Sequence, residues 1–469
     1  MELSWVDELR KVVDPVRILT NTSDLYSYSY DASFGTYLPD VVVQVETAIE
    51  VSNVLKLANR ERLPVYPRGA GTSLSGGPLP VQKGIVMDFS QWKNRLEIHP
   101  DDLVAVVSPG VVTSDINKAA GNYGLMYPPD PSSEHVSTIG GNLAENSGGP
   151  RGLKYGVTKD YVIGLEVVTP EGEIIRTGGK TFKNVTGYDL TKLIIGSEGT
   201  LGVITEAILK LIPKPPATMT MMAVFDDLAL SGKAVSTILT SGILPSKIEL
   251  LDKASMAAVE NYQPIGLPTD AEAIILLELD GHEIAIRLEM DRVGKIMNEV
   301  GARKTVVAES DEEADQLWKA RKLVSPAIAK IKPTKVSEDA TVPRSKIPEM
   351  IERLKVIGQK FDVHLVVFGH AGDGNLHPNI LCDIRDTEEM MRVEKAVSEI
   401  FDAALELGGT LSGEHGIGTM KAPFMKRELG AAGLEMMRRI KDAWDPNQIL
   451  NPGKVFPSSD EEVLVLRNV

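Results

Sequence analysis

The segment spanning residues 367–379 constrains the fold most strongly, because an apolar run, a tight turn and a second apolar run follow one another there. Its Asp373-Gly374 dipeptide is typical of two-residue hairpin turns, in which both central residues take positive φ. Counting outward from that turn predicts that His370 lies opposite His377, with Cβ atoms roughly 4.5–5.5 Å apart. Two imidazoles at that spacing can reach one metal ion.

A second segment, Ser412–Gly418, places Glu414 beside His415 in a glycine-rich loop. Two histidines and one glutamate leave coordination positions open, which is the composition of a catalytic metal site rather than a closed structural one. Fe²⁺, Zn²⁺ and Mn²⁺ all accept such ligands, so we predict one divalent metal without choosing among them. The alternative is a tight hairpin whose histidines only hydrogen-bond to the backbone.

Composition limits the class of protein. A chain of 469 residues suggests two or three domains. The hydrophobic content of 43% and charged content of 25% are ordinary for a globular protein. A net charge of −15 argues against a nucleic-acid partner, which would favour a basic face. With Cys382 as the only cysteine, the chain can form no internal disulfide and cannot hold an iron–sulfur cluster alone.

The same sequence suggests a location. Residues 1–8 lack a basic region followed by an apolar one, so we expect no signal peptide. No apolar run approaches 18 residues, so we expect no membrane span. The expectation is a cytoplasmic protein.

A β-α-β unit is expected near the beginning, from a strand at Val41–Val45, a helix at Ala48–Asn59 and a strand at Leu63–Tyr66. It leads into Pro67–Gly77, where four glycines in nine residues let backbone N–H groups converge on an anion. The loop is not G-x-G-x-x-G and no helical pattern follows at once, so the Rossmann fingerprint fails.

Further glycine-rich loops separate short β-rich runs as far as residue 205. They include residues 137–144, 146–149 and 196–202. Such density suits an extended ligand that the backbone contacts along its length, and a two-part nucleotide is the natural candidate.

Beyond Pro213–Pro216, which reads as a linker, strand and helix patterns alternate. Strands paired with helices packed on one side predict an α+β cap. The expected strands are Met219–Phe225 and Ala273–Leu279, and the expected helices are Leu228–Ser241, Ile284–Val300, Asp311–Lys330, Ile347–Lys360, 390–407 and 424–443.

Four landmarks in order resemble the FAD-linked 2-hydroxyacid dehydrogenases, which include glycolate oxidase flavin subunits and D-lactate dehydrogenases. They are Pro67–Gly77; Thr138–Asn142 with Gly196–Thr205; His370–Asn379 with Ser412–Gly418; and Leu450–Lys454. The resemblance covers nearly the whole chain, and the combination is far more specific than any one landmark.

The resemblance implies an α+β fold with a vanillyl-alcohol-oxidase-like (PCMH-type) FAD-binding domain, a ferredoxin-like cap and a C-terminal helical tail. The corresponding boundaries are 1–215, 216–423 and 424–469, the last segment returning to the FAD domain. The residues implied to bind FAD are Pro67, Arg68, Gly69, Ala70, Gly71, Thr72, Ser73, Asp130, Thr138, Gly140, Gly141, Asn142, Ser147, Gly148, Tyr155, Gly156, Glu198, Gly202, Val203, Ile204 and Asn451. Because Thr72 stands where some relatives attach flavin through a histidine, we expect non-covalent FAD.

The resemblance also implies roles around the substrate. His370, His377 and Glu414 match metal ligands, and His415 matches a general base. Arg321 matches the clamp for the substrate carboxylate. The further substrate contacts implied are Ser325, Lys335 and Asn379, with Lys335 the least well aligned by spacing.

The implied reaction is oxidation of a small D-2-hydroxy acid to the 2-keto acid, assisted by the metal, with hydride passing to the flavin. D-lactate is the expected substrate and glycolate the second candidate. Since this chain holds no second redox centre that its sequence reveals, we expect a partner, either an electron-transferring flavoprotein or an iron–sulfur subunit.

Two other classes of protein would use some of the same residues. A metal-dependent hydrolase would also use two histidines and a glutamate to activate water, but it leaves the glycine-rich loops unexplained. A non-catalytic flavin subunit of an electron-transfer complex would keep the loops but need no substrate chemistry.

Overall fold

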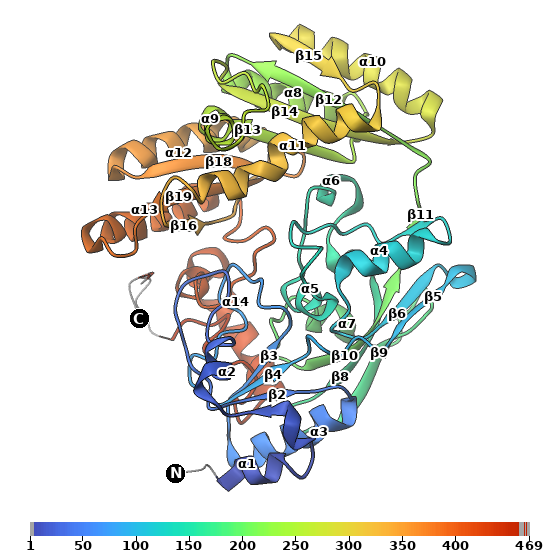
Figure 1. Ribbon diagram of the computed structural model, residues 1–469, viewed down its shortest axis with the longest axis vertical. Helices are drawn as coiled ribbons and strands as arrows, with labels where there is room; N and C mark the ends of the chain where they lie inside the picture. The colour runs from blue at the N-terminus through green and yellow to red at the C-terminus, as the bar shows by residue number, and fades with distance from the viewer. Residues whose placement is uncertain (1–3, 459–463, 465, 467–469) are drawn as a thin grey trace.

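The computed structural model describes residues 4–458, 464 and 466, and its strands form three sheets of four or more strands and one two-stranded pair (Figure 1). The first sheet has the order β1-β2-β4-β3, in which β2 and β3 both run parallel to β4. Helix α3 connects β2 to β3, as the β-α-β pattern predicted. The bounds are α1 Ser4–Leu9, β1 Ile18–Leu19, α2 Thr22–Tyr26, β2 Val41–Gln44, α3 Ala48–Glu61, β3 Val65–Arg68 and β4 Ile85–Asp88.

The second sheet is antiparallel, with the order β5-β6-β10-β8-β9. Every second residue of β10 is buried, which is the period-two pattern of a strand with one face in a core. The bounds are β5 Leu96–His99, β6 Val104–Val107, α4 Thr113–Gly121, β7 Leu125–Met126, α5 Ile139–Glu145, α6 Gly152–Tyr155, β8 Val162–Val168, β9 Ile174–Gly178, α7 Leu190–Ile194, β10 Val203–Lys210 and β11 Ile212–Pro213.

One segment expected to be a loop forms a helix. Residues 139–145 make up α5, and Thr138 caps it by accepting a hydrogen bond from the Gly141 N–H at 3.4 Å. Two glycines in the first turn, Gly140 and Gly141, concealed the helical pattern because glycine disfavours helix interiors.

The third sheet has eight strands. Its main order is β15-β12-β14-β13-β18-β19-β16, and β17 also pairs with β19. It forms the upper layer in Figure 1. The bounds are β12 Ala217–Phe225, α8 Leu228–Thr240, β13 Lys247–Asp252, α9 Lys253–Tyr262, β14 Ala273–Gly281, α10 Glu283–Val300, β15 Lys304–Val307, α11 Asp311–Ile328, β16 Thr334–Ser337, β17 Ala340–Thr341, α12 Ile347–Phe361, β18 His364–His370, β19 Asn375–Cys382 and α13 Thr387–Glu406.

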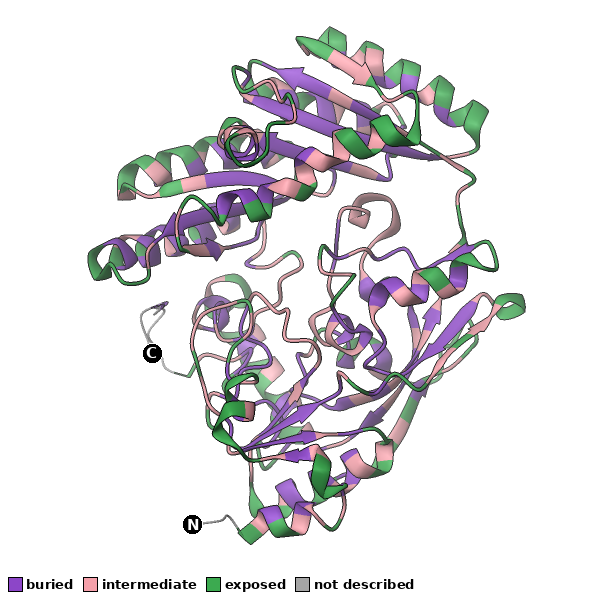
Figure 2. Cartoon of the chain, viewed as in Figure 1, coloured by how far each residue is buried: buried purple, intermediate pink, exposed green. Residues whose placement is uncertain are grey.

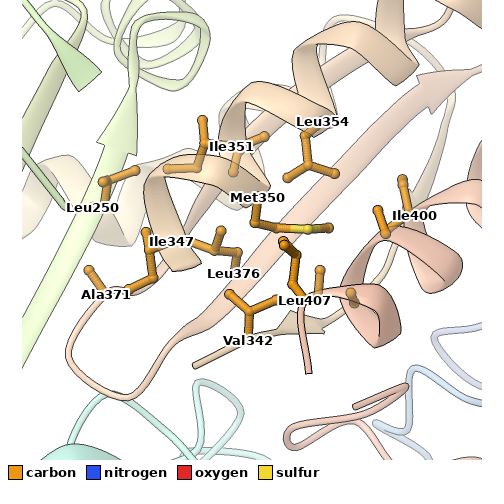
Figure 3. Close-up of a cluster of buried hydrophobic side chains, with 14 of the residues drawn as sticks. Leu250, Val342, Ile347, Met350, Ile351, Leu354, Ala371, Leu376, Ile400 and Leu407 are labelled. Atoms are coloured by element: carbon orange, nitrogen blue, oxygen red, sulfur yellow. The ribbon is translucent and has the colours of Figure 1, made fainter. Parts of the chain in front are cut away.

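Helices cover both faces of this sheet, so the expectation of helices on one side was wrong. The helices α8, α10, α12 and α13 share one hydrophobic core with it, while α9 and α11 share another. Figure 2 shows the central strands buried, while the edge strand β15 and the outer helix faces are largely exposed or half-buried. Within the larger core, Met350 and Leu354 of α12 lie in one apolar cluster with Leu376 of β19 and Ile400 of α13 (Figure 3). A strand buried on both faces loses the alternation that would have revealed the second layer.

The hairpin forms, but with a register different from the predicted one. His370 pairs with Asn375, and His377 pairs with Phe368. Residues 371–374 form the connection, and of the Asp-Gly pair Gly374 alone has positive φ, at 92°. The turn is therefore not the two-residue type that the dipeptide suggested. The two histidines are diagonal neighbours on one face, with ring centroids 4.9 Å apart.

The last described residues contact both upper and lower parts of the molecule. After α14 (Met425–Trp444), which is kinked at Gly430, the chain passes beside β3, where the Val65 N–H donates to Ile449 O at 2.8 Å. Leu464 and Leu466 then pack into the larger core of the third sheet. The boundaries at 215/216 and 423/424 remain our proposal. Among the described residues, no helix has the length and apolarity to cross a membrane.

The buried ammonium group of Lys441 hydrogen-bonds the end of α14 to neighbouring segments, and its loss should destabilise the protein. Lys441 Nζ donates to Thr200 O at 2.7 Å, to Leu450 O at 2.9 Å and to Asp445 Oδ2 at 2.6 Å. Lys441→Met would leave the buried Asp445 carboxylate without its cation, at a cost of about 3–5 kcal/mol in the free energy of unfolding.

Urea denaturation would measure this change. The matched control is Arg439→Met on the same helix, which removes an exposed ion pair with Glu435 and should change stability by about 0.3–0.5 kcal/mol. Equal effects from both substitutions would contradict this account of Lys441.

Candidate active site

One cavity of about 490 Å³ lies between the glycine-rich loops and the third sheet. The loop side contributes Pro67, Gly69, Ala70, Gly71, Thr72, Ser73, Thr138, Gly141, Asn142, Ser147, Gly148, Glu198 and Asn451. The sheet side and the 412–418 loop contribute Arg321, Ser325, Lys335, Ser337, Phe368, His377, Glu414 and His415. Segments far apart in sequence therefore bring most residues of both predicted sets to one space, although the buried His370 does not line it.

A smaller cavity of about 50 Å³ shares several walls with the first and is lined by other residues of the glycine-rich loops. It is lined by Arg68, Gly140, Gly202, Val203 and Ile204, among others. Arg68 is buried, with Nη2 donating to Tyr30 O at 2.7 Å, while its buried Nη1 has no hydrogen-bond partner in the described part of the chain. A buried cationic donor facing bare backbone fits a diphosphate.

Three residues implied to bind FAD line neither cavity. The Asp130 carboxylate accepts a hydrogen bond from the Arg151 N–H at 3.0 Å, and Tyr155 OH donates to Asp280 Oδ2 at 2.7 Å. Gly156 takes positive φ, 82°, beyond Tyr155. The structure gives all three a part in holding the chain around α6 and against β14, and their contact with cofactor stays a prediction.

Glycine is required where the loops approach each other. A Cβ atom on Gly69 would lie 2.2 Å from Thr138 Oγ1, and one on Gly140 would lie 2.9 Å from Pro109 Cβ and 3.0 Å from Pro109 O. These contacts leave no room for a side chain, so the backbone itself forms the cavity wall. That is the condition for close approach to an anion.

The three predicted metal ligands converge from two elements and one loop. Glu414 Oε1 lies 3.1 Å from His370 Nε2 and 3.2 Å from His377 Nε2. One ligand atom from each residue lies within 4.8 Å of the others, as one ion requires. Burial lowers the pKa of His370, but Glu249 and Glu414 more than offset this and raise it well above its usual value. The two carboxylates thus favour positive charge between them, which suits a cation.

Glu249 on β13 supports this cluster from behind, and sequence reasoning missed it. It lies opposite His370 in the strand register, where its Oε1 is 2.5 Å from His370 Nδ1. Its Oε2 accepts a hydrogen bond from Arg321 Nε at 2.6 Å. Burial raises the pKa of Glu249, but His370 and Arg321 outweigh burial and hold it at about 2. A carboxylate on the far nitrogen of a metal-binding histidine fixes its orientation and tautomer.

Arg321 is held so that part of its guanidinium faces the cavity. Its Cζ atom lies 4.6 Å from the centroid of the Phe368 ring, in addition to the bond to Glu249. Lys335 Nζ donates to Ser325 Oγ at 3.3 Å, and burial, followed by the charge of Arg321, lowers the Lys335 pKa. The predicted substrate contacts Arg321, Ser325 and Lys335 therefore share one wall.

His415 lines the same cavity, with its ring stacked 5.2 Å from that of His377. Burial lowers its pKa to about 4, against the opposing effect of the Asp339 carboxylate. The lowered pKa favours the neutral imidazole, which carries one N–H and can accept a proton on its other nitrogen. Asn379 is fully buried and is absent from the cavity lining; its Nδ2 donates to His377 O at 2.8 Å.

A weak signal for the missed carboxylates was present in the sequence. Glu249 interrupts the apolar run Ile248–Leu251, and Asp339 follows another acid, Glu338. A lone carboxylate in an apolar run indicates a buried charge that needs partners, and those partners came from distant strands. Residue patterns within one strand cannot identify them.

Comparison with known proteins decides the family. Residues 39–178 match the family described as FAD binding domain, and residues 214–455 match FAD linked oxidases, C-terminal domain. The glycolate oxidase subunit GlcD of Bacillus subtilis (strain 168) is 47% identical, with 96% of each chain covered. The D-lactate dehydrogenase of Archaeoglobus fulgidus is 36% identical, covering 97% of this chain and 99% of that protein. This chain belongs to the FAD-linked oxidase family.

It is thus an FAD-dependent oxidoreductase of the 2-hydroxyacid-oxidising group, and the hydrolase and non-catalytic alternatives are set aside. p-Cresol methylhydroxylase with substrate bound has the same fold, at a TM-score of 0.81 and 18% identity, covering 96% of each chain. The expected α+β fold of PCMH-type FAD domain and cap is confirmed. The preference for D-lactate over glycolate stays a prediction.

Adding a methyl group at Gly69 should reduce FAD binding. In Gly69→Ala the new Cβ must displace Thr138 Oγ1 from 2.2 Å, which disturbs the cap of α5 and the cavity wall. We expect purified protein with a lower ratio of flavin to protein absorbance. Gly121→Ala is the matched control, because a Cβ there meets no atom within 4 Å. Full flavin content in Gly69→Ala would contradict this role for the loop.

Proposed function

We propose that this FAD-linked oxidase converts a small 2-hydroxy monocarboxylate, glycolate or D-lactate, to the 2-keto acid, using non-covalent FAD and one divalent metal. The observation that carries the proposal is the single cavity that joins the glycine-rich loops to Arg321, His377, Glu414 and His415. Its relatives include a glycolate oxidase subunit at 47% identity and D-lactate dehydrogenases at 34% and 36%. The sequence led us to expect D-lactate first, and the higher identity of the glycolate oxidase subunit moves our preference to glycolate.

Arg321 would bind the substrate carboxylate. Its Nε is occupied by Glu249 and its flat face by Phe368, which leaves the terminal N–H groups in a fixed plane. A planar pair of donors matches a carboxylate. Lys335 Nζ donates to Ser325 Oγ at 3.3 Å, and Ser325 lies one turn after Arg321 on α11, so both cations would act on one carboxylate rather than on the two ends of a dicarboxylate.

FAD, when bound, supplies a hydride acceptor, and a divalent cation held by His370, His377 and Glu414 supplies a Lewis acid for the 2-hydroxyl. His415 would take the hydroxyl proton. Its Nδ1 faces Asp339, at 3.8 Å from Oδ1, which leaves Nε2 as the nitrogen available to the cavity. A positioned base of this kind contributes roughly 10²–10⁴-fold to rate.

Anaerobic flavin bleaching tests the reaction. We expect glycolate or D-lactate to bleach the absorbance near 450 nm, and L-lactate and D-2-hydroxyglutarate to bleach it far more slowly. Chelation should abolish bleaching, and added Zn²⁺, Mn²⁺ or Fe²⁺ should restore it. Bleaching that ignores the chelator would exclude a catalytic metal, and no bleaching by either favoured acid in metal-replete protein would contradict the proposed reaction.

Replacing Arg321 should weaken substrate binding more than it slows the chemical step. Arg321→Lys keeps the charge but loses the planar fork, and hydrogen bonds to charged groups are each worth about 1.5–3 kcal/mol. We therefore expect KM to rise by roughly tenfold or more. The control is Lys322→Arg, because Lys322 is exposed on the same helix. An unchanged KM in Arg321→Lys would place the carboxylate elsewhere.

Electrons on the reduced flavin should leave through another protein. The sole cysteine excludes an iron–sulfur cluster held by this chain alone. We propose that an electron-transferring flavoprotein or an iron–sulfur subunit accepts them. Turnover with oxygen alone should be slow and should accelerate with an artificial electron acceptor such as a quinone dye. Equally rapid turnover with oxygen would remove the need for a partner.

A further inference from the structure

Asp339, between β16 and β17, is a buried carboxylate whose two oxygens face different parts of the site. Oδ2 accepts hydrogen bonds from the loop that carries Glu414 and His415. The donors from this loop are Ser412 Oγ at 3.0 Å, Gly413 N at 3.0 Å, Glu414 N at 3.0 Å and His415 N at 2.9 Å. The buried ammonium of Lys421 also lies 3.3 Å from Oδ2 and balances its charge. One oxygen thus fixes the backbone of a predicted metal ligand and of a predicted base.

The other oxygen, Oδ1, faces two imidazoles. It lies 3.8 Å from His415 Nδ1, and one ligand atom each of Asp339, His377 and His415 lies within 4.8 Å of the others. Asp339 Oδ1, His377 Nδ1 and His415 Nδ1 are all buried and have no hydrogen-bond partner in the described part of the chain. Hydrogen bonds of catalytic groups are often long before ligands bind and shorten in the complex.

We propose that Asp339 is the positioning residue of this site: Oδ2 holds the 412–415 loop, and Oδ1 receives the Nδ1–H groups of His377 and His415. The expected effect on the rate of flavin reduction rests on the proposed function. With the protons on Nδ1, His377 offers the Nε2 lone pair that lies 3.2 Å from Glu414 Oε1, where the metal would bind. His415 likewise offers Nε2 as the base. Metal-binding histidines usually donate the other N–H to a carboxylate or carbonyl.

Asp339→Asn tests this with little change in shape. If the new amide nitrogen faces the loop, it cannot accept the hydrogen bonds that Oδ2 accepts there. If it faces the imidazoles, it donates to their Nδ1 atoms and moves their protons to Nε2. Either orientation removes one of the two functions of the carboxylate. A reversed tautomer disables a histidine base even when its position is unchanged.

We expect Asp339→Asn to lower the anaerobic rate of flavin reduction by roughly 10²–10⁴-fold and metal affinity by roughly 10–100-fold. KM should change little because Arg321 is untouched. The matched control is Glu338→Gln: this neighbouring buried acid makes no hydrogen bond to residues 412–415 among the described contacts, and its variant should keep both properties. Wild-type metal affinity and flavin reduction in Asp339→Asn would overturn the proposal.

A measurement on the unmodified holoenzyme keeps the test independent of whether the variant folds. The chain has seven histidines, so ¹⁵N-histidine labelling of Zn²⁺-loaded protein gives few imidazole signals. Their ¹⁵N shifts distinguish protonated from unprotonated nitrogens. We expect His377 and His415 both to carry the proton on Nδ1; a proton on Nε2 of His415 would contradict the proposal. This result does not depend on substrate, so it separates failure of the Asp339 role from failure of the proposed reaction.

Discussion

Two carboxylates without exposed surface, Glu249 and Asp339, hold the charged groups of the cavity in place. An isolated buried charge is costly, and a buried charge persists because partners surround it. Glu249 lies between His370 and Arg321, and Asp339 lies between the 412–415 loop and two imidazoles. The groups that would bind metal, bind the carboxylate and accept the proton are thus coupled through two anions behind the cavity wall.

Strand register places Glu249, His370 and His377 next to one another. Glu249 lies directly opposite His370 on neighbouring strands, and His377 lies diagonally across from His370. A one-residue slip of β18 against either neighbour would turn His370 to the opposite face of the sheet. The helices α9, α11, α12 and α13 bury both faces of the sheet and so fix the strand register. The packing of the third sheet therefore also determines the geometry of the site.

Sequence patterns were enough for the glycine-rich loops, the histidine pair and most of the helices. Those features depend on neighbours in the chain, as at Ile347–Phe361, where the helix predicted over Ile347–Lys360 is found in full. The hairpin register was wrong because Asp373-Gly374 suggested a two-residue turn, whereas the connection uses all of 371–374. Glu249 and Asp339 were missed because their roles depend on partners that are distant in sequence.

The claim that one cavity joins flavin, metal and substrate carboxylate is tested most directly by a crystal structure of the holoenzyme with a bound 2-hydroxyacid analogue. Anomalous scattering would locate the metal. The account predicts metal on His370, His377 and Glu414, the analogue's carboxylate on Arg321, and flavin against the loop at 67–73 of the same cavity. Metal bound elsewhere, or a carboxylate away from Arg321, would contradict it.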